Sequence, residues 1–138
     1  MSVEAQQVVG FVFDALAADT AFSSAVGGRI YRDLVPQAAA LPAATVTLVS
    51  ATDVNTLGAD RAFETVLVDV RVVMSGSSYG PINAAADRAD AVLQNRLGTR
   101  GGVAVVELRR EQVQTFIETE AGATFAHIIQ SYRSEAHA

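Results

Sequence analysis

The sequence contains no cysteine and no lysine, and it has no long apolar run. Without cysteine the chain forms no disulfide and offers no thiolate to a metal ion. No apolar run approaches the roughly 18 residues that a membrane-spanning helix needs, although half of the residues are hydrophobic. The first residues also lack the basic segment followed by an apolar one that marks a secretion signal. These absences favour a protein made in the cytoplasm that does not enter a membrane.

Basic charge is also scarce. The chain has ten basic residues, all of them arginine, against fifteen acidic residues, which gives a formal net charge of −5. Affinity for nucleic-acid phosphates comes from basic patches that release counterions. An acidic chain is therefore a poor candidate for a domain that grips nucleic acid.

Histidine, the commonest general base and metal ligand, occurs only as His127 and His137. His127 alternates with two apolar neighbours, which predicts a packed structural histidine on a strand face, and His137 is expected to be solvated. There is no serine elbow, no metal-type histidine pair and no phosphate-binding loop, because the glycine-rich residues 98–102 lack lysine and follow a helix. We therefore expect no catalytic residue, no metal and no cofactor.

An enzymatic site remains an alternative only if acidic residues from distant segments meet His127. Asp69, Glu107 and Glu118 are the residues that could reach it across a sheet. Two of them converging on the imidazole in a concave pocket would indicate general acid and base chemistry or a metal site.

Along the chain, hydrophobic periodicity predicts two principal helices and a series of strands. The helices are expected at 3–18 and 81–97, and the strands at about 43–51, 62–74, 103–109, 112–119 and 123–133. The 138 residues are enough for one domain with its own core, and the end from Ser134 is expected to fray. This order predicts a single α+β domain over 1–138, with a mainly antiparallel sheet and the two helices packed on one of its faces.

The longest strand, 62–74, carries the clearest two-residue period. Its even positions from Val66 to Val72 are all valine, whereas Asp69 and Arg71 share the opposite face. A slip of one residue would bury both charges, so the register is strongly specified. Asp69 and Arg71 are expected to be surface charges, and a salt bridge between subunits is the alternative.

A polar segment, 52–61, precedes that strand and predicts a hairpin tip. Thr52, Asp53, Asn55 and Thr56 are too polar for a core, and Leu57 at such a tip would be an apolar side chain without a local partner. The letters Asp53, Asn55, Gly58 and Glu64 also match four positions of a calcium-binding loop. Leucine occupies a position that needs an oxygen ligand, and strands rather than helices flank the segment, so we favour the hairpin.

The order of these features resembles a known family. The residues that carry the resemblance are Gly27-Gly28-Arg29-Ile30-Tyr31, Pro36-Gln37 and Leu41-Pro42, between the first helix and the strands. With the polar hairpin, the valine-rich strand, the alanine-rich helix and the C-terminal strands, the chain is similar to the tail-terminator or tail-completion proteins of long-tailed phages. The resemblance covers nearly the whole chain. One departure is the pair Ala43-Ala44, where the family commonly has a larger apolar residue.

The resemblance implies a structural virion protein and not an enzyme. Such proteins form a ring, typically of six copies, at the head-proximal end of the tail tube. The ring stops tube growth, contacts the major tail tube protein and the neck or connector protein, and leaves a channel through which DNA passes without specific binding. The same part occurs in gene transfer agents and phage-like bacteriocins, so the expected location is a virion or phage-like particle. The candidate interface residues are Thr52, Asp53, Asn55, Thr56, Leu57, Arg29, Asp69 and Arg71.

Two alternatives to a tail terminator stay open at this level. A head-completion adaptor or stopper in the neck would have the same overall character and differ in which face meets the tail. A small-ligand-binding or enzymatic α+β domain is the alternative from another class. Arg29 likewise has a second interpretation, as a residue that bridges a loop within its own subunit.

Overall fold

The computed structural model describes residues 3–138, and the side chains of residues 4–58 and 62–138. Within this range the chain forms three helices and six strands. In chain order they are α1 (Val3–Ala18), α2 (Thr20–Ala25), β1 (Ile30–Arg32), β2 (Ala43–Thr56), β3 (Ala59–Ser75), α3 (Gly80–Leu93), β4 (Gly98–Arg100), β5 (Val103–Glu120) and β6 (Ala123–His137). None of the helices in the described range is long and apolar enough to cross a membrane.

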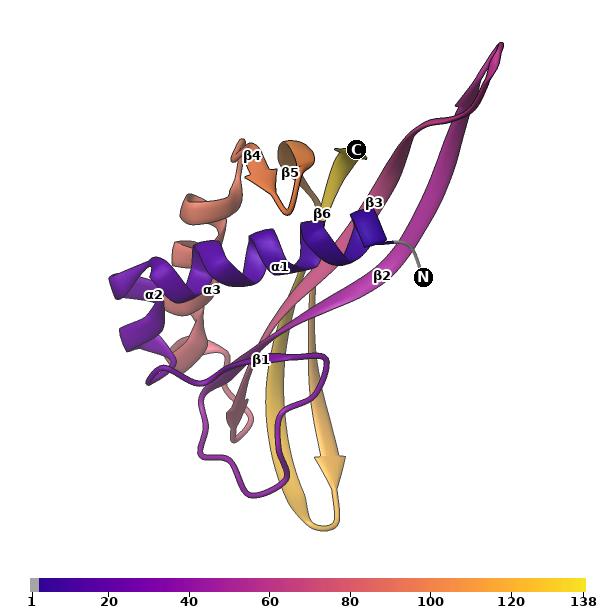
Figure 1. The fold of residues 1–138 in the computed structure, drawn as a ribbon. Coiled ribbons are helices and arrows are strands. Elements are labelled where there is room, and N and C mark those ends of the chain that lie inside the picture. Colours follow the sequence, from indigo (N-terminus) through magenta and orange to yellow (C-terminus); the bar gives the residue numbers. More distant parts are fainter. Residues whose placement is uncertain (1–2) are drawn as a thin grey trace.

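The strands form one mixed sheet with the order β1-β2-β3-β6-β5-β4. β1 lies parallel to β2, and the other neighbours are antiparallel. Two long hairpins, β2–β3 and β5–β6, extend in opposite directions beyond the helices (Figure 1). The α+β class is therefore as expected, whereas the sheet contains a parallel pair that the sequence pattern did not indicate.

The core lies between one face of the sheet and the helices. Val66, Val68, Val70 and Val72 are fully buried there, as the two-residue period predicts. They belong to one cluster with apolar residues of all three helices, among them Val8, Val12, Leu16, Phe22, Ile82 and Leu93. Asp69 and Arg71 lie on the other face and are half-buried. We call the face that packs on the helices the inner face, and the opposite one the outer face.

The short helix α2 was not expected, because Asp19 and Thr20 resemble a break in the sequence. Asp19 instead caps this helix by accepting a hydrogen bond from the backbone N–H of Phe22 at 2.9 Å. Its carboxylate also accepts two hydrogen bonds from Arg88 of α3, at 2.7 and 2.9 Å. The Arg88 hydrogen bond and the backbone hydrogen bond lower the pKa of Asp19 to about 2. Asp19 thus ties α2 to α3.

Three boundaries expected from the sequence are wrong. The second helix ends at Leu93 and not at 97, because Gln94 is extended and Asn95 adopts a left-handed φ of 66°. The segments 103–109 and 112–119 are one strand, β5, in which the polar residues between them form irregularities in the pairing. Residues 98–102 do not form only a turn, since Gly98–Arg100 pairs with β5 as β4.

The C-terminal end is ordered as well, so the prediction of a frayed tail from Ser134 is wrong for residues 134–137. β6 continues to His137 and pairs with β3 on one side and β5 on the other. Ser134 and Ala136 are buried, and the His137 ring stacks on Phe63 with centroids 4.9 Å apart. Because residues 134–137 are mostly small or polar, their sequence did not indicate that they form part of a strand paired on both edges.

Candidate interaction surfaces

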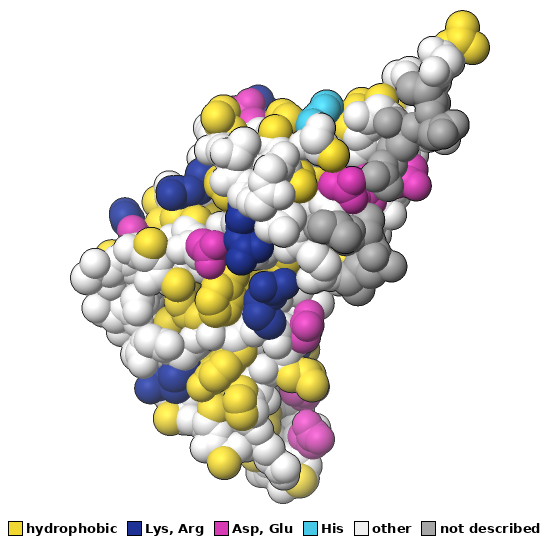
Figure 2. Space-filling view, viewed as in Figure 1, with side chains coloured by type: hydrophobic (Ala, Val, Ile, Leu, Met, Phe, Trp, Pro, Cys, Tyr) yellow, Lys and Arg dark blue, Asp and Glu magenta, His cyan; other side chains and the backbone are white. Residues whose placement is uncertain are grey.

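The β2–β3 hairpin carries most of the interface residues that the sequence indicated. Thr52, Asp53, Asn55 and Thr56 lie on β2 with exposed side chains. Leu57 occupies the turn and is 107% exposed, so no described part of the chain covers it. Figure 2 shows hydrophobic atoms at the far end of this projection. An apolar side chain this far from the core makes no packing contacts within the monomer, so a partner can bury it without breaking any.

The same segment shows why the calcium pattern is not a loop. Asp53 of β2 lies directly opposite Glu64 of β3 in the antiparallel register. Gly58, with φ of +85°, provides the left-handed residue of the tight turn. The residues that match the calcium-loop pattern therefore belong to a hairpin, as the strand-like flanking sequence indicated.

Asp69 and Arg71 lie on the outer face of β3 but do not pair with each other. Asp69 accepts a hydrogen bond from the Ser131 hydroxyl of β6 at 2.5 Å. The Arg71 guanidinium lies 5.8 Å from the centre of the Phe116 ring, a cation–π distance. Among the residues whose side chains are described, no carboxylate forms an ion pair with Arg71. Arg71 therefore keeps its charge available at the outer face.

Arg29 acts within its own subunit. Its Nε donates a hydrogen bond to the carbonyl of Pro42 at 2.9 Å. The guanidinium lies over Gly27, where an added Cβ would come within 2.6 Å of it. The contact fixes the start of β1 beside the start of β2, which agrees with the bridging interpretation. A contact to a neighbouring copy through Arg29 stays a prediction.

A hollow of about 660 Å³ opens on the outer face between the segment 33–41 and the ends of the long strands. The segment contributes an apolar wall from Leu34, Val35, Pro36 and Leu41. The sheet contributes Thr45, Arg71, Val73, Ser75, Glu118, Glu120, Phe125 and His127. The loop before Pro42 was expected only as a connection, so this concave surface was missed.

His127 lies in the lining of the hollow and is 5% exposed. Its Nε2 lies 3.1 Å from Glu118 Oε1, and its ring stacks on Phe116 with centroids 4.4 Å apart. Burial lowers the pKa of His127, the Glu118 hydrogen bond opposes this shift, and Arg71 adds to it. A neutral imidazole that donates from Nε2 to Glu118 leaves Nδ1 as an acceptor, and Nδ1 has no hydrogen-bond partner in the described range.

Only one of the three acidic residues that could have made an enzymatic site reaches His127. Glu118 does, whereas Asp69 is bonded to Ser131 and Glu107 to Arg109. No group of three or more potential metal ligands occurs in the part of the chain that was searched, which is the described one. The convergence of two carboxylates on His127, which would have indicated an enzymatic site, does not occur among the described side chains.

The distal part of β5 is an open sheet edge. β4 covers β5 at residues 103–105, and residues 94–96 bond to Leu108 and Arg110. From residue 112 onward, β5 pairs with β6 alone among the described residues. Every residue from Arg109 to Glu120 is exposed. Four large apolar side chains on β5 are more than a third exposed: Val106, Val113, Phe116 and Ile117. The sequence pattern predicted strands at 103–109 and 112–119, but a strand pattern alone does not show whether either face is covered.

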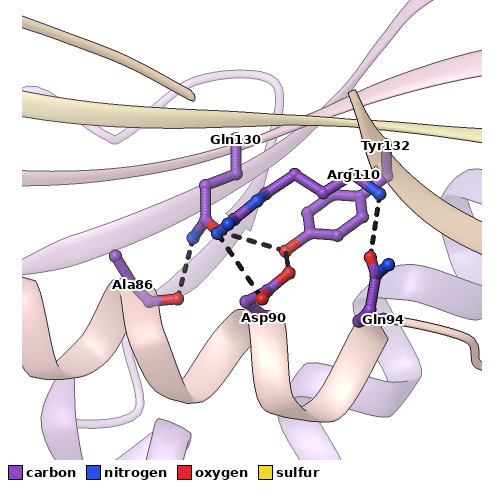
Figure 3. Close-up of polar contacts among 6 residues, drawn as sticks. All are labelled: Ala86, Asp90, Gln94, Arg110, Gln130 and Tyr132. Carbon is purple, nitrogen blue, oxygen red and sulfur yellow. Dashed lines mark hydrogen bonds and ion pairs between the residues drawn. The ribbon is translucent and has the colours of Figure 1, made fainter. Parts of the chain in front are cut away.

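A polar network, buried at Gln130 and Tyr132, fixes α3 to the sheet next to this edge (Figure 3). Gln130 of β6 donates to the carbonyl of Ala86 at 2.8 Å, and the Tyr132 hydroxyl donates to Asp90 at 2.9 Å. Arg110 of β5 donates to Gln130 at 2.9 Å and lies 3.5 Å from Asp90. Burial, followed by the Asp90 hydrogen bond, raises the pKa of Tyr132. The Tyr132 hydroxyl thus remains protonated and acts as a donor. The network has a structural role, and no short sequence motif indicated it.

Comparison with known proteins identifies the family to which the chain belongs. Residues 11–134 match the family model described as "Tail completion protein gp17". The fold is similar to a chain of a solved structure titled "Virion of native gene transfer agent (GTA) particle", with a TM-score of 0.78 and 18% identity over 100% of both chains. A second solved structure aligns with a TM-score of 0.57 and 19% identity over 97% of this chain and 96% of that one. No curated protein matches the sequence significantly.

Proposed function

The chain belongs to the tail completion protein gp17 family, and from this premise we propose that it closes the head-proximal end of a tail tube as a ring of copies. Members of this family are structural tail proteins, so the chain is not an enzyme and its location is a virion or phage-like particle. The ring would stop tube growth and present a joining surface to the neck. The likeness to a chain of a gene transfer agent particle supports a particle of that kind.

A ring is needed because of the size of one copy. A domain of 138 residues has a radius of gyration of roughly 14 Å, which is too small to enclose a DNA duplex by itself. A ring also requires a head-to-tail contact in which two different surfaces of neighbouring copies meet. Six copies, the number that the family resemblance implies, would carry six times the charge of −5. Such an acidic ring would let DNA pass without holding it.

The observation that carries this proposal is the exposed Leu57 at the end of the projecting hairpin. We assign the contact with a neighbouring copy, or with the tail tube protein, to Thr52, Asp53, Asn55, Thr56 and Leu57. Burial of a leucine side chain contributes about 1.5–3 kcal/mol, enough to matter when it is repeated around a ring. Asp69 and Arg71 remain candidate charges at such a contact.

The test uses particles assembled without the chain and complemented by variants. Without the chain, tails should be of abnormal length or not joined to heads, and the wild-type chain should restore joining. Leu57→Asp should keep the circular dichroism spectrum and unfolding midpoint of the wild type yet restore few joined particles. Asp87→Asn, on the exposed side of α3, is the matched control and should restore joining fully. Normal yield with Leu57→Asp would remove the hairpin from the interface, and a chain that lies in the neck apart from the tube would make it an adaptor or stopper.

A further inference from the structure

We propose that the open edge of β5, over residues 112–120, binds an extended strand of another particle protein in which basic and aliphatic residues alternate. This surface is separate from the hairpin tip to which we assign the ring contact. The inference goes beyond that ring, because it names a partner segment of a different protein.

The backbone of β5 provides the first half of the site. β4 pairs with β5 at residues 103–105, Asn95 and Arg96 bond to the backbone of Leu108, and Gln94 accepts from the backbone N–H of Arg110. From residue 112 onward, β5 pairs only with β6 among the described residues, so its other side presents unpaired N–H and C=O groups. Nine residues of strand span about 30 Å. Residues 112–120 contain neither lysine nor proline, and the irregularities in the β5–β6 pairing lie before them. Lysine, proline and bulges are among the features with which proteins block strand edges. An edge of this kind is a template for an added strand.

The side chains on the two faces of β5 determine which side chains an added strand should carry on each of its faces. Phe116 lies opposite His127, and Glu118 opposite Phe125, so these residues share the outer face. Ile117 lies opposite Ala126, a core residue, and therefore shares the inner face with Val113. Residues that lie directly opposite across two strands interact. One face of the added strand would therefore meet glutamates and an aromatic ring, and the other would meet exposed aliphatic side chains.

Charge decides the chemistry of the outer face. The hollow reaches β5 itself, since Glu118 and Glu120 belong to its lining. Asp33, Glu118 and Glu120 contribute three carboxylates against the single guanidinium of Arg71. His127 is neutral, because burial lowers its pKa. Basic side chains on the partner would therefore be attracted at Glu118 and Glu120, and the apolar wall of the hollow would receive the methylene groups of a long basic side chain.

A second copy of this chain fits the edge less well. On the other edge strand, the part of β2 beyond its pairing with β1, residues 47–56, contains no basic residue and includes Asp53. Each copy also carries a net charge of −5, so a copy brings like charge toward the two glutamates. Charge complementarity thus favours a partner that is basic along one face, from another component of the tail or neck.

The experiment titrates the full 138-residue chain, labelled with ¹⁵N, with three synthetic nine-residue peptides. One alternates arginine and valine, one alternates glutamate and valine, and one has the arginine–valine composition in blocks. The alternating basic peptide should shift and protect the amides of residues 112–120, whereas the acidic peptide should not. Glu118→Gln with Glu120→Gln should weaken binding roughly fivefold, and Asp87→Asn should leave it unchanged.

Several outcomes would overturn the proposal. Absence of binding at about 1 mM basic peptide, equal binding of the acidic peptide, or equal binding of the block peptide would each do so. A chain that self-associates through this edge, detected by sedimentation and abolished by Ile117→Lys, would make a second copy the occupant. None of these results depends on the ring, which is tested through Leu57.

Discussion

At the scale of single residues, the chemistry of His127 is decided by what surrounds it. Phe116 covers one face of the ring, and Glu118 accepts from Nε2 at 3.1 Å. The carboxylate favours the charged imidazole, but burial disfavours it more strongly, and Arg71 adds to the effect. The residue that sequence analysis indicated as packed and structural is therefore neutral at physiological pH, beside a single carboxylate.

His127→Gln tests this interpretation through the pH dependence of stability. The folded pKa lies below the ordinary value of 6.5, so the unfolded chain binds a proton at a higher pH than the folded chain does. The contribution of His127 to stability is thus fully present above pH 6.5 and decreases as the pH falls below it. The variant should lack this component, and at pH 7.5 its free energy of unfolding should differ from wild type by less than about 1 kcal/mol.

Urea unfolding from pH 7.5 to pH 5 measures both quantities. His137→Gln, which removes the more exposed histidine, is the control and should retain the dependence. An unchanged slope in His127→Gln would mean that folding does not shift the pKa of His127. Lost tail joining by a folded His127→Gln variant would mean that the residue has a role in function.

At the scale of elements, helices and strands that form through local periodicity were predicted well, whereas strands that form only through long-range pairing were not. α1 and the register of β3 were predicted because their periodicity is local and strong. β1 and β4 have three residues each and exist only through pairing with β2 and β5, so no local pattern marks them. β5 was divided in two because Arg109–Gln112 is polar, although Arg110 is the residue through which the strand joins the network under α3.

Tyr132→Phe measures what that network contributes. The variant removes one hydroxyl that donates to Asp90 and leaves this half-buried carboxylate with fewer partners. The free energy of unfolding should fall by about 1–3 kcal/mol, measured by urea denaturation at pH 7. Tyr31→Phe is the matched control, since the Tyr31 hydroxyl makes no hydrogen bond to the described residues, and it should change stability by less than about 0.5 kcal/mol. Equal effects of the two variants would show that the network adds no net stability.

At the scale of the whole molecule, the sheet order could not be read from the sequence. β6 lies between β3 and β5, so the last strand of the chain is a central one, and only long-range pairing decides this. The same topology explains the candidate surfaces. It sends one hairpin beyond the core at one end and leaves β5 open at the other (Figure 1). Leu57, Asp69 and Arg71 could be named from the sequence, and so could a strand at 112–119, whereas the hollow arises from segments distant in the chain.

The absence of cysteine allows the hairpin contact to be mapped in the assembled particle. Leu57→Cys introduces the only thiol of the chain, to which a photoreactive benzophenone group can be attached. If neighbouring copies meet through the hairpin, illumination of particles should give a product of twice the mass of the chain. Asp87→Cys, labelled in the same way on α3, should give little of it, and the dilute isolated chain should give none with either variant. A product that joins the chain only to the tail tube protein would show that the hairpin contacts the tube and not a neighbouring copy. No product from a labelled, joined particle would exclude the tip from both, because a reactive group on a side chain that a partner buries lies within reach of that partner.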